Sequence, residues 1–387
     1  MKIAKNVNRL GTELVYNIFA ETKKLEKQGK KIIDLSLGQS DFKSPKHAVD
    51  ATIQALKDGH HGYTLPNGII ECREAVSRKI KSLYNVKINP ERIVIMPGGK
   101  PTMHFAISFF GEPGAEIIYP DPGFPIYESM INYTGATAVP YNLTEKKDFS
   151  IDSDKVLSLI NEKTRLIILN NPHNPTGSFT EKKVIDKLVE GLMNFPDVAI
   201  LSDEIYDRLI FDKKEIPTIL NYPKLYDRLI VLNGWSKTYA MTGWRLGWGV
   251  WPEQLIEHVF KFCVNSHSCV NTAAQYGAIA ALDGPEDHLN DMLKEFVIRR
   301  KLIVDGLRSL KGIECSLPGG SFFVFPNVKG TGMNGEEFTD RCLQEAGVAM
   351  IPGIAFGKFA TDYVRFNFAT SQDNISKALE KINNMLG

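Results

Sequence analysis

The sequence predicts an α/β protein with a large domain, built on a mostly parallel seven-stranded sheet flanked by helices, and a smaller α+β domain built from both chain ends. Short apolar runs alternate with helical patterns through the middle of the chain, which is typical of a parallel sheet covered by helices. A long amphipathic segment then leads into a mixed strand and helix pattern. We therefore expect residues 45–285 to form the large domain, and residues 1–44 and 286–387 to form the small one.

Apolar runs place six strands of the large sheet. They are Ile93–Met96, Glu116–Tyr119, Leu166–Asn170, Val198–Ser202, Leu229–Leu232 and Leu246–Val250. Periodic apolar positions between the strands predict helices that cover the sheet. Examples are Pro101–Phe110, Glu181–Met193 and Pro252–Phe262.

The C-terminal part is expected to begin with one long amphipathic helix, Glu286–Leu310, on which Arg299, Arg300 and Lys301 are exposed. Alternating strands and helices follow it. They are the strands Phe322–Phe325 and Tyr363–Phe368 and the helices Gly335–Ala346 and Asp373–Met385. The first forty residues are expected to pack against this part.

Composition excludes several classes of function. A net charge of +1 over 387 residues gives no electrostatic reason to bind nucleic acid or a membrane surface. The segment Met1–Leu10 is polar and basic, unlike a secretory signal, and no uncharged apolar run approaches the length of a membrane span. The five cysteines form no CxxC pair, so reduced thiols in a cytoplasmic protein are expected. His60, His61 and His173 lack metal-ligand spacing, so they are expected to be solvated or packed, with no metal site.

The most informative residue is Lys237, which follows the apolar run ending at Leu232. Arg245 stands eight residues later, among glycines. A primary amine can condense with an aldehyde, and a guanidinium fork can hold a phosphate in a bidentate manner. This pair of groups therefore predicts a phosphate-bearing aldehyde cofactor, pyridoxal 5′-phosphate (PLP).

A possible phosphate cradle is the run Met96–Pro101, with Gly98, Gly99 and Lys100 between a strand and a helix. Glycine N–H groups and a helix N-terminus favour an anion. A tight strand-to-helix turn without a ligand is the alternative. Ser236 and Arg245 are expected to close around the same anion.

Asp203 stands at the carboxyl end of an apolar strand, where open parallel sheets bind ligands. A carboxylate there can keep a pyridine nitrogen protonated, and Tyr206 can hydrogen-bond the ring's phenolic oxygen. The alternative is an ordinary helix N-cap with a first-turn acid.

Three further groups follow other strands. Asn174, at another strand end, can donate to the ring oxygen and to a substrate carboxylate. The Asn174-Pro175 bond is a candidate cis peptide. By composition alone, the run Asn170–Gly177 is also typical of an ordinary turn. Phe124 can stack on the ring or serve as a core aromatic. Arg365, inside an apolar strand, must face a carboxylate, either in a structural ion pair or as the α-carboxylate of an amino-acid substrate.

Taken together, these motifs resemble those of the fold-type I, PLP-dependent class I aminotransferases, the broad aspartate aminotransferase group. The resemblance covers nearly the whole chain, from Leu35-Ser36-Leu37-Gly38-Gln39 to Arg365. The Ser-Lys-x7-Arg, Asp-Glu-Ile-Tyr and Asn-Pro-Thr-Gly elements occur in the family's order. Two departures are Gly234, where many relatives carry a serine, and Phe124, where tryptophan or tyrosine is common.

The resemblance implies a role for each candidate residue. Lys237 would be the Schiff-base lysine, Asp203 would face the ring nitrogen, and Tyr206 and Asn174 would hold the ring oxygen. The phosphate would be bound by Gly98, Gly99, Lys100, Ser236 and Arg245, with Tyr63 reaching it across a dimer interface. Arg365 and Gly38 would bind the substrate carboxylate. Such enzymes are typically homodimers with shared active sites.

The expected reaction moves an amino group between an L-amino acid and a 2-oxo acid in two half-reactions, with aspartate, glutamate or an aromatic amino acid as donor. Lys237 would take and return the α-proton. Aspartate aminotransferase is the best prediction, although no second cation could be assigned among Arg9, Lys43 and Arg208. An aromatic-tolerant pocket would instead use the following residues: Phe19, Phe124, Tyr127 and Phe356.

A C–S β-lyase or a decarboxylase on the same fold is the alternative, because these reactions share their first carbanion. A regulatory protein that merely binds PLP would need a DNA-binding module, and the segment before Leu35 is too short for one. A non-catalytic homologue is disfavoured because Lys237, Asp203, Asn174 and Arg365 are all present.

Overall fold

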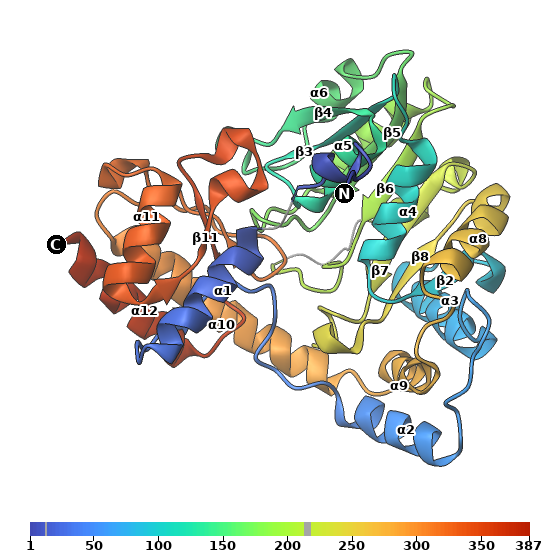
Figure 1. Ribbon diagram of the computed structural model, residues 1–387, viewed down its shortest axis with the longest axis horizontal. Helices are drawn as coiled ribbons and strands as arrows, with labels where there is room; N and C mark the ends of the chain where they lie inside the picture. The colour runs from blue at the N-terminus through green and yellow to red at the C-terminus, as the bar shows by residue number, and fades with distance from the viewer. Residues whose placement is uncertain (12–13, 213–217) are drawn as a thin grey trace.

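The large sheet has seven strands in the order β2-β8-β7-β6-β5-β3-β4 in the computed structural model, which describes residues 1–11, 14–212 and 218–387 (Figure 1). The strands are β2 (Ile93–Met96), β3 (Glu116–Asp121), β4 (Thr137–Asn142), β5 (Thr164–Asn170), β6 (Ala199–Asp203), β7 (Leu229–Gly234) and β8 (Gly247–Val250). Strands β4, β3, β5, β6 and β7 pair in parallel, whereas β8 is antiparallel to both β7 and β2. The predicted mostly parallel, seven-stranded sheet is confirmed.

Strand β4 is the one that the sequence did not predict. It lies at the edge of the sheet, and its side chains are mostly only partly buried, so its apolar pattern is weak. It also contains Pro140, which cannot donate to a ladder and is tolerated on edge strands.

Both faces of the sheet are covered by helices, which explains the continuous apolar runs of its strands. Alternate residues of one strand enter different cores: Ile167 and Leu169 belong to one cluster, and Leu166 and Ile168 to the other. The first face packs against α2 (Lys46–Lys57), α3 (Ile70–Tyr84), α6 (Ser153–Ser158), α7 (Lys182–Leu192) and α9 (Thr272–Asp283). The second packs against α4 (Lys100–Phe110), α5 (Ile126–Thr134) and α8 (Ile256–Ser266).

The remaining elements come from both ends of the chain and lie together beside the large sheet (Figure 1). They are α1 (Leu14–Lys27), β1 (Ile33–Asp34), α10 (Asp287–Ser309), β9 (Phe323–Val324), α11 (Gly335–Arg341), β10 (Val348–Ala349), β11 (Ile351–Pro352), β12 (Val364–Asn367) and α12 (Gln372–Leu386). Strand β1 pairs with β10, and β11, β12 and β9 form an antiparallel sheet. The helix expected over residues 335–346 continues past α11 as a π-helical turn, Cys342–Ala346. The domain bounds at residues 45 and 285 stay a prediction.

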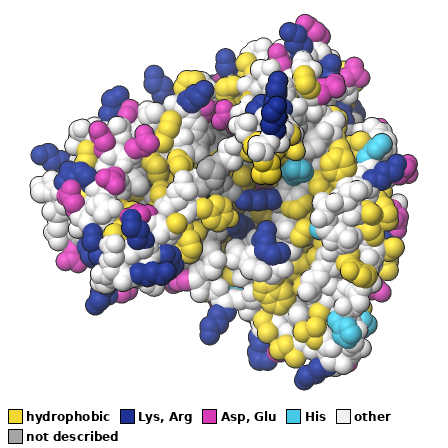
Figure 2. All heavy atoms as spheres, viewed as in Figure 1, with side chains coloured by type: hydrophobic (Ala, Val, Ile, Leu, Met, Phe, Trp, Pro, Cys, Tyr) yellow, Lys and Arg dark blue, Asp and Glu magenta, His cyan; other side chains and the backbone are white. Residues whose placement is uncertain are grey.

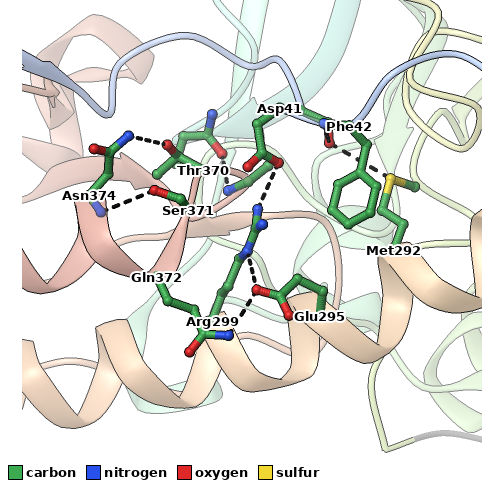
Figure 3. Close-up of polar contacts among 12 residues, drawn as sticks. Asp41, Phe42, Met292, Glu295, Arg299, Thr370, Ser371, Gln372 and Asn374 are labelled. Atoms are coloured by element: carbon green, nitrogen blue, oxygen red, sulfur yellow. Dashed lines mark hydrogen bonds and ion pairs between the residues drawn. The ribbon is translucent and has the colours of Figure 1, made fainter.

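The exposure expected for Arg299 and Arg300 on α10 is wrong, because both side chains are only 6% exposed. Arg299 Nη1 lies 2.7 Å from Asp41 Oδ1, and its Nε lies 2.9 Å from Glu295 Oε1 (Figure 3). Arg300 pairs with Asp212 at 2.6 Å. Partners distant in sequence therefore cover this part of α10, whereas Lys301 is exposed as expected.

Arg299 also connects the two chain ends. The backbone N–H of its partner Asp41 donates to the carbonyl of Ala369, and Gln372 on α12 donates to Glu295 (Figure 3). The segment that carries Gly38 is thereby fixed to α10 and to the start of α12. No described helix is both long enough and apolar enough to cross a membrane.

Candidate active site

A cavity of about 540 Å³ lies where the carboxyl ends of the parallel strands face the elements from the chain ends. Lysine and arginine side chains gather in this hollow on the surface (Figure 2). Most of the predicted site residues line it: Gly38, Gly99, Lys100, Phe124, Asn174, Asp203, Tyr206, Ser236, Lys237, Arg245 and Arg365. Parallel strands end at one edge of a sheet, so residues far apart in sequence meet there.

Lys237 is partly buried in the turn that follows β7. The preceding Trp235 is fully buried, and its Nε1 donates to the carbonyl of Ala278, which anchors the turn. Lys237 Nζ donates to the carbonyl of Gly38 at 2.5 Å. Burial, followed by the charges of Arg365, Arg245 and Lys100, lowers the pKa of the Lys237 amine to about 8. A large fraction of this amine is therefore neutral and nucleophilic in mildly alkaline solution.

Asp203 ends β6 with its side chain buried. Its Oδ2 accepts from Tyr127 Oη at 2.8 Å, and its Oδ1 accepts from the N–H of Ile205 at 3.2 Å. Burial raises the pKa of Asp203 to about 6, and the hydrogen bond from Tyr127 opposes this rise. The carboxylate is therefore ionised near neutral pH and aimed into the cavity from the strand end.

The expectation that Tyr127 and Phe19 line the cavity is wrong. Tyr127 is fully buried beneath it, bonded to Asp203 and packed edgewise against Phe124, with ring centroids 5.9 Å apart. Phe19 lies outside the cavity, on the part of α1 where it contacts Lys23. Tyr16, also on α1, lines the cavity instead.

Arg365 is buried on β12, and its hydrogen bonds fix its orientation. Nη1 donates to Asn174 Oδ1 at 2.9 Å, and Nη2 donates to the carbonyl of Ser36 at 2.7 Å. The guanidinium lies 4.2 Å from the ring centroid of Phe323 and 4.7 Å from that of Phe356. Two aromatic rings and two acceptors therefore hold one cation at the cavity wall.

Asn174 belongs to a turn that Asn170 orders. Asn170 Oδ1 accepts from the N–H of Asn174 at 3.0 Å, while its Nδ2 donates to the carbonyl of Asp203 at 3.0 Å. The Asn174-Pro175 peptide is cis, as predicted. Neighbouring His173 is buried, its Nδ1 lies 2.8 Å from Thr176 Oγ1, and burial lowers its pKa to about 3, so the predicted packing role is confirmed.

Arg245 reaches the same edge because β8 runs in the opposite direction to its neighbours. The start of β8 therefore lies beside the ends of β2 and β7. A Cβ on Gly98, which has a φ of +91°, would lie 2.2 Å from Arg245 Nη2. The glycine thus leaves the space that the guanidinium fills.

Gly234, one of the departures from the family pattern, has a steric reason. A Cβ on Gly234 would lie 2.8 Å from the Cα of Gly247, and a Cβ on Gly247 would lie 2.4 Å from the carbonyl carbon of Gly98. Gly98, Gly234 and Gly247 form what we call the glycine contact. A side chain at position 234 would force apart the backbones of β7 and β8.

Two predicted residues lie outside the cavity lining. Gly98 lies against the guanidinium of Arg245, as described above. Tyr63 is 93% exposed in the loop between α2 and α3. Sequence reasoning missed the roles of Tyr127 at Asp203, Phe323 at Arg365 and Asn170 at Asn174. These are neutral residues whose partners only the fold reveals. Among the described residues, no group of three or more histidine, cysteine or acidic side chains is arranged to hold a metal ion.

Comparison with known proteins agrees with this geometry. Residues 30–382 match the family model of aminotransferase class I and II. The chain belongs to this family. The aminotransferase is 36% identical to an aspartate aminotransferase of Pyrococcus horikoshii over 387 residues, which covers 99% of this chain and 97% of the relative.

Solved structures lead to the same family. The aminotransferase superposes on an aspartate aminotransferase from Rhizobium meliloti with a TM-score of 0.95 and 29% identity, covering 100% and 99% of the two chains. It also matches an aromatic aminotransferase from Pyrococcus horikoshii, with a TM-score of 0.89, 32% identity and coverage of 94% and 98%. The family resemblance inferred from the motifs is confirmed.

Proposed function

We propose that this aminotransferase uses PLP and transfers the amino group of a dicarboxylic L-amino acid, aspartate or glutamate, to a 2-oxo acid. The observation that carries the proposal is the set of groups in one cavity: a lysine with a lowered pKa, a buried acid at a strand end and two arginines. When bound, PLP supplies a cationic ring that accepts electrons from the substrate's α-carbon.

The donor set fits PLP group by group. Lys237 Nζ is the amine that would bind the aldehyde, and Asp203 is the acid that would face the ring nitrogen. Arg245 lies against Gly98, and Arg245 and Gly99 both line the cavity, so a cation stands next to glycine backbone, as a phosphate requires. Further contacts would come from Gly99, Ser236, Phe124, Asn174 and Tyr206, all on the cavity wall.

The residues of the chain then divide the work of the reaction. Arg365 binds the α-carboxylate of the substrate through its guanidinium fork. Lys237 Nζ, once released by the incoming amino group, accepts the α-proton and later returns it. A pKa of about 8 suits both transfers, because general acid–base catalysis is most efficient when the pKa is close to the working pH.

Lys100 supports the choice of a dicarboxylic substrate. Its Nζ lies 5.5 Å from the ring centroid of Phe124 and 5.9 Å from that of Tyr16, on α1. We propose that it binds the distal carboxylate of the substrate rather than the phosphate, where the sequence had placed it. Of the cations considered from sequence, Arg9 donates to two backbone carbonyls of α5 and Arg208 is paired with Glu286.

Aromatic amino acids are a second class of donor that the wall accommodates. Tyr16, Phe124 and Phe356 all line the cavity and present aromatic surface to a substrate side chain. The likeness to the aromatic aminotransferase of Pyrococcus horikoshii agrees with this second class.

We also propose a cytoplasmic homodimer in which Tyr63 reaches the phosphate in the partner's site. Tyr63 is almost fully exposed in its own chain, and neighbouring apolar side chains are exposed as well. These are Ile53, Leu56, Leu65 and Ile70. A cluster of this kind is typical of a surface that a second copy covers.

The test is a panel of amino donors and 2-oxo acids, followed at the absorbance bands of the PLP-loaded enzyme. We expect the loaded spectrum to change on addition of aspartate or glutamate and to return on addition of a 2-oxo acid. Lys237→Ala should remove both turnover and the lysine-dependent absorbance while the protein stays folded. Release of pyruvate and ammonia from cystathionine without any 2-oxo acid would instead indicate a β-lyase, and loss of carbon dioxide a decarboxylase.

A further inference from the structure

We propose that Asp121 is a positioning residue, which holds the segment Phe356–Phe359 so that Phe356 stays against the guanidinium of Arg365. The inference rests on the proposed function, in which Arg365 binds the substrate carboxylate. Asp121 lies at the end of β3, in the large sheet, whereas Phe356 and Arg365 belong to the C-terminal part of the chain.

The turn Asp121–Phe124 contacts this segment through several polar groups. The carboxylate of Asp121 is 3% exposed, and the backbone N–H groups of Lys358 and Phe359 favour its ionised form. Two residues along, the N–H of Gly123 donates to the carbonyl of Phe356 at 2.7 Å. The turn that supplies Phe124 to the cavity therefore also fixes the backbone around Phe356.

Gly357 shows how closely the carboxylate fits. Its φ of +150° lies in the region that favours glycine, and a Cβ there would be 1.8 Å from Asp121 Oδ1. That oxygen is buried and has no hydrogen-bond partner in the described part of the chain. The carboxylate thus lies directly against the Cα of Gly357, and any side chain at this position would displace the segment.

Phe356 transmits this contact to the site. Its ring is one of the two that enclose the Arg365 guanidinium, at 4.7 Å, and both residues line the cavity. The hydrogen bonds of Arg365 to Asn174 and Ser36 lie on the other elements. A shift of Phe356 would therefore open one wall around the cation without removing its acceptors.

The charges around Asp121 favour a carboxylate at the pH of the assay. Burial raises its pKa to about 6, with a further rise from Glu128 on α5, while the two N–H groups and the charge of Lys358 oppose the rise. At pH 8 the carboxyl group is therefore ionised.

The experiment compares Asp121→Ala, Asp121→Asn and Gly357→Ala in the PLP-loaded enzyme at pH 8, with L-aspartate and 2-oxoglutarate as substrates. Asp121→Ala and Gly357→Ala should raise KM for aspartate about tenfold, the size of one charge-assisted hydrogen bond, and leave kcat within about twofold. Asp121→Asn keeps an acceptor and should recover most of the affinity. Lys358→Ala, which removes an exposed side chain but keeps its N–H, is the matched control and should match the wild type.

A second measurement needs no turnover. Amide hydrogen exchange of residues 353–360 should be faster in Asp121→Ala than in the wild type, with and without PLP, and near wild-type rates in Asp121→Asn. The dissociation constant for PLP should be unchanged in all the variants. Gly357→Ala keeps Asp121 in place, so it tests the contact even if Asp121→Ala does not fold.

Two results would separate the proposals. If Arg365→Lys raises KM while Asp121→Ala and Gly357→Ala leave both KM and amide exchange unchanged, the role of Asp121 is refuted and the proposed function stands. If the wild type shows no transamination, or Arg365→Lys leaves KM unchanged, the proposed function fails, while amide exchange still reports whether Asp121 holds the segment.

Discussion

Tyr127 Oη donates a 2.8 Å hydrogen bond to Asp203 Oδ2 in the buried layer beneath the cavity. The phenol and the acid come from different elements, α5 and β6, and Tyr127 also packs edgewise on Phe124. One residue thus supports both the acid expected at the ring nitrogen and the aromatic side chain expected on the ring face.

Tyr127→Phe is expected to raise the pKa of Asp203 above its value of about 6, because the lost hydrogen bond stabilises the ionised carboxylate. The acidic limb of kcat/KM should then move to higher pH, with activity about tenfold lower at pH 6. The measurement is a pH profile from 5 to 9. Tyr141→Phe is the matched control, since Tyr141 is equally buried but bonds to the carbonyl of Ile168. Identical profiles for both variants and the wild type would rule out this role.

Arg365→Gln is expected to raise the pKa of Lys237 in the PLP-free protein, because the charge of Arg365 is the second cause of its depression after burial. An amine of lowered pKa reacts once the pH exceeds that pKa. Acylation of Lys237, followed by peptide mass spectrometry, should therefore have a midpoint near pH 8 in the wild type and a higher one in the variant. An unchanged or lower midpoint in Arg365→Gln would contradict the assignment, and acylation of the exposed Lys301 gives an internal reference in the same sample.

Lys100→Met is expected to raise KM for aspartate and glutamate by roughly 10- to 100-fold, the value of about 1.5–3 kcal/mol for a hydrogen bond to a charged group. KM for phenylalanine should stay within about twofold, because the long apolar side chain still covers Phe124 and Tyr16. Retention of PLP should be unaffected. If the variant instead releases PLP and keeps its substrate preference, Lys100 binds the phosphate of the cofactor and not the substrate.

Arg299→Ala is expected to lower the free energy of unfolding by about 3 kcal/mol, since it leaves Asp41 and Glu295 without their buried cation. The control is Lys301→Ala on the same helix, whose exposed pair with Asp305 is worth less than about 1 kcal/mol. Urea unfolding of both variants measures the difference. Equal free energies of unfolding for the two variants would mean that the ion pairs of Arg299 with Asp41 and Glu295 make no net contribution to stability.

The sequence predicted those parts of the molecule whose signal is local. Apolar runs marked the strands that are covered on both faces, and polar residues after them marked Lys237, Asp203 and Asn174 at one edge. The edge strand β4 was missed because partial exposure and Pro140 weaken its pattern. Arg299 and Tyr127 were misplaced because their partners, Asp41 and Asp203, lie 258 and 76 residues away and become neighbours only in the fold.

The glycine contact of Gly98, Gly234 and Gly247 limits how this enzyme can be altered. A Cβ on Gly234 or Gly247 would clash with the backbone of another segment, and a Cβ on Gly98 would clash with the guanidinium of Arg245, so enlarging any one of the three disturbs the packing around Arg245. Saturation mutagenesis should therefore find almost no replacements there that leave the protein folded, while many replacements of Lys100 and Tyr16 should change the choice of substrate and keep the fold. Substitutions meant to admit new amino donors should therefore be made on the α1 and α4 side of the cavity, because the packing around Arg245 leaves almost no space for larger side chains.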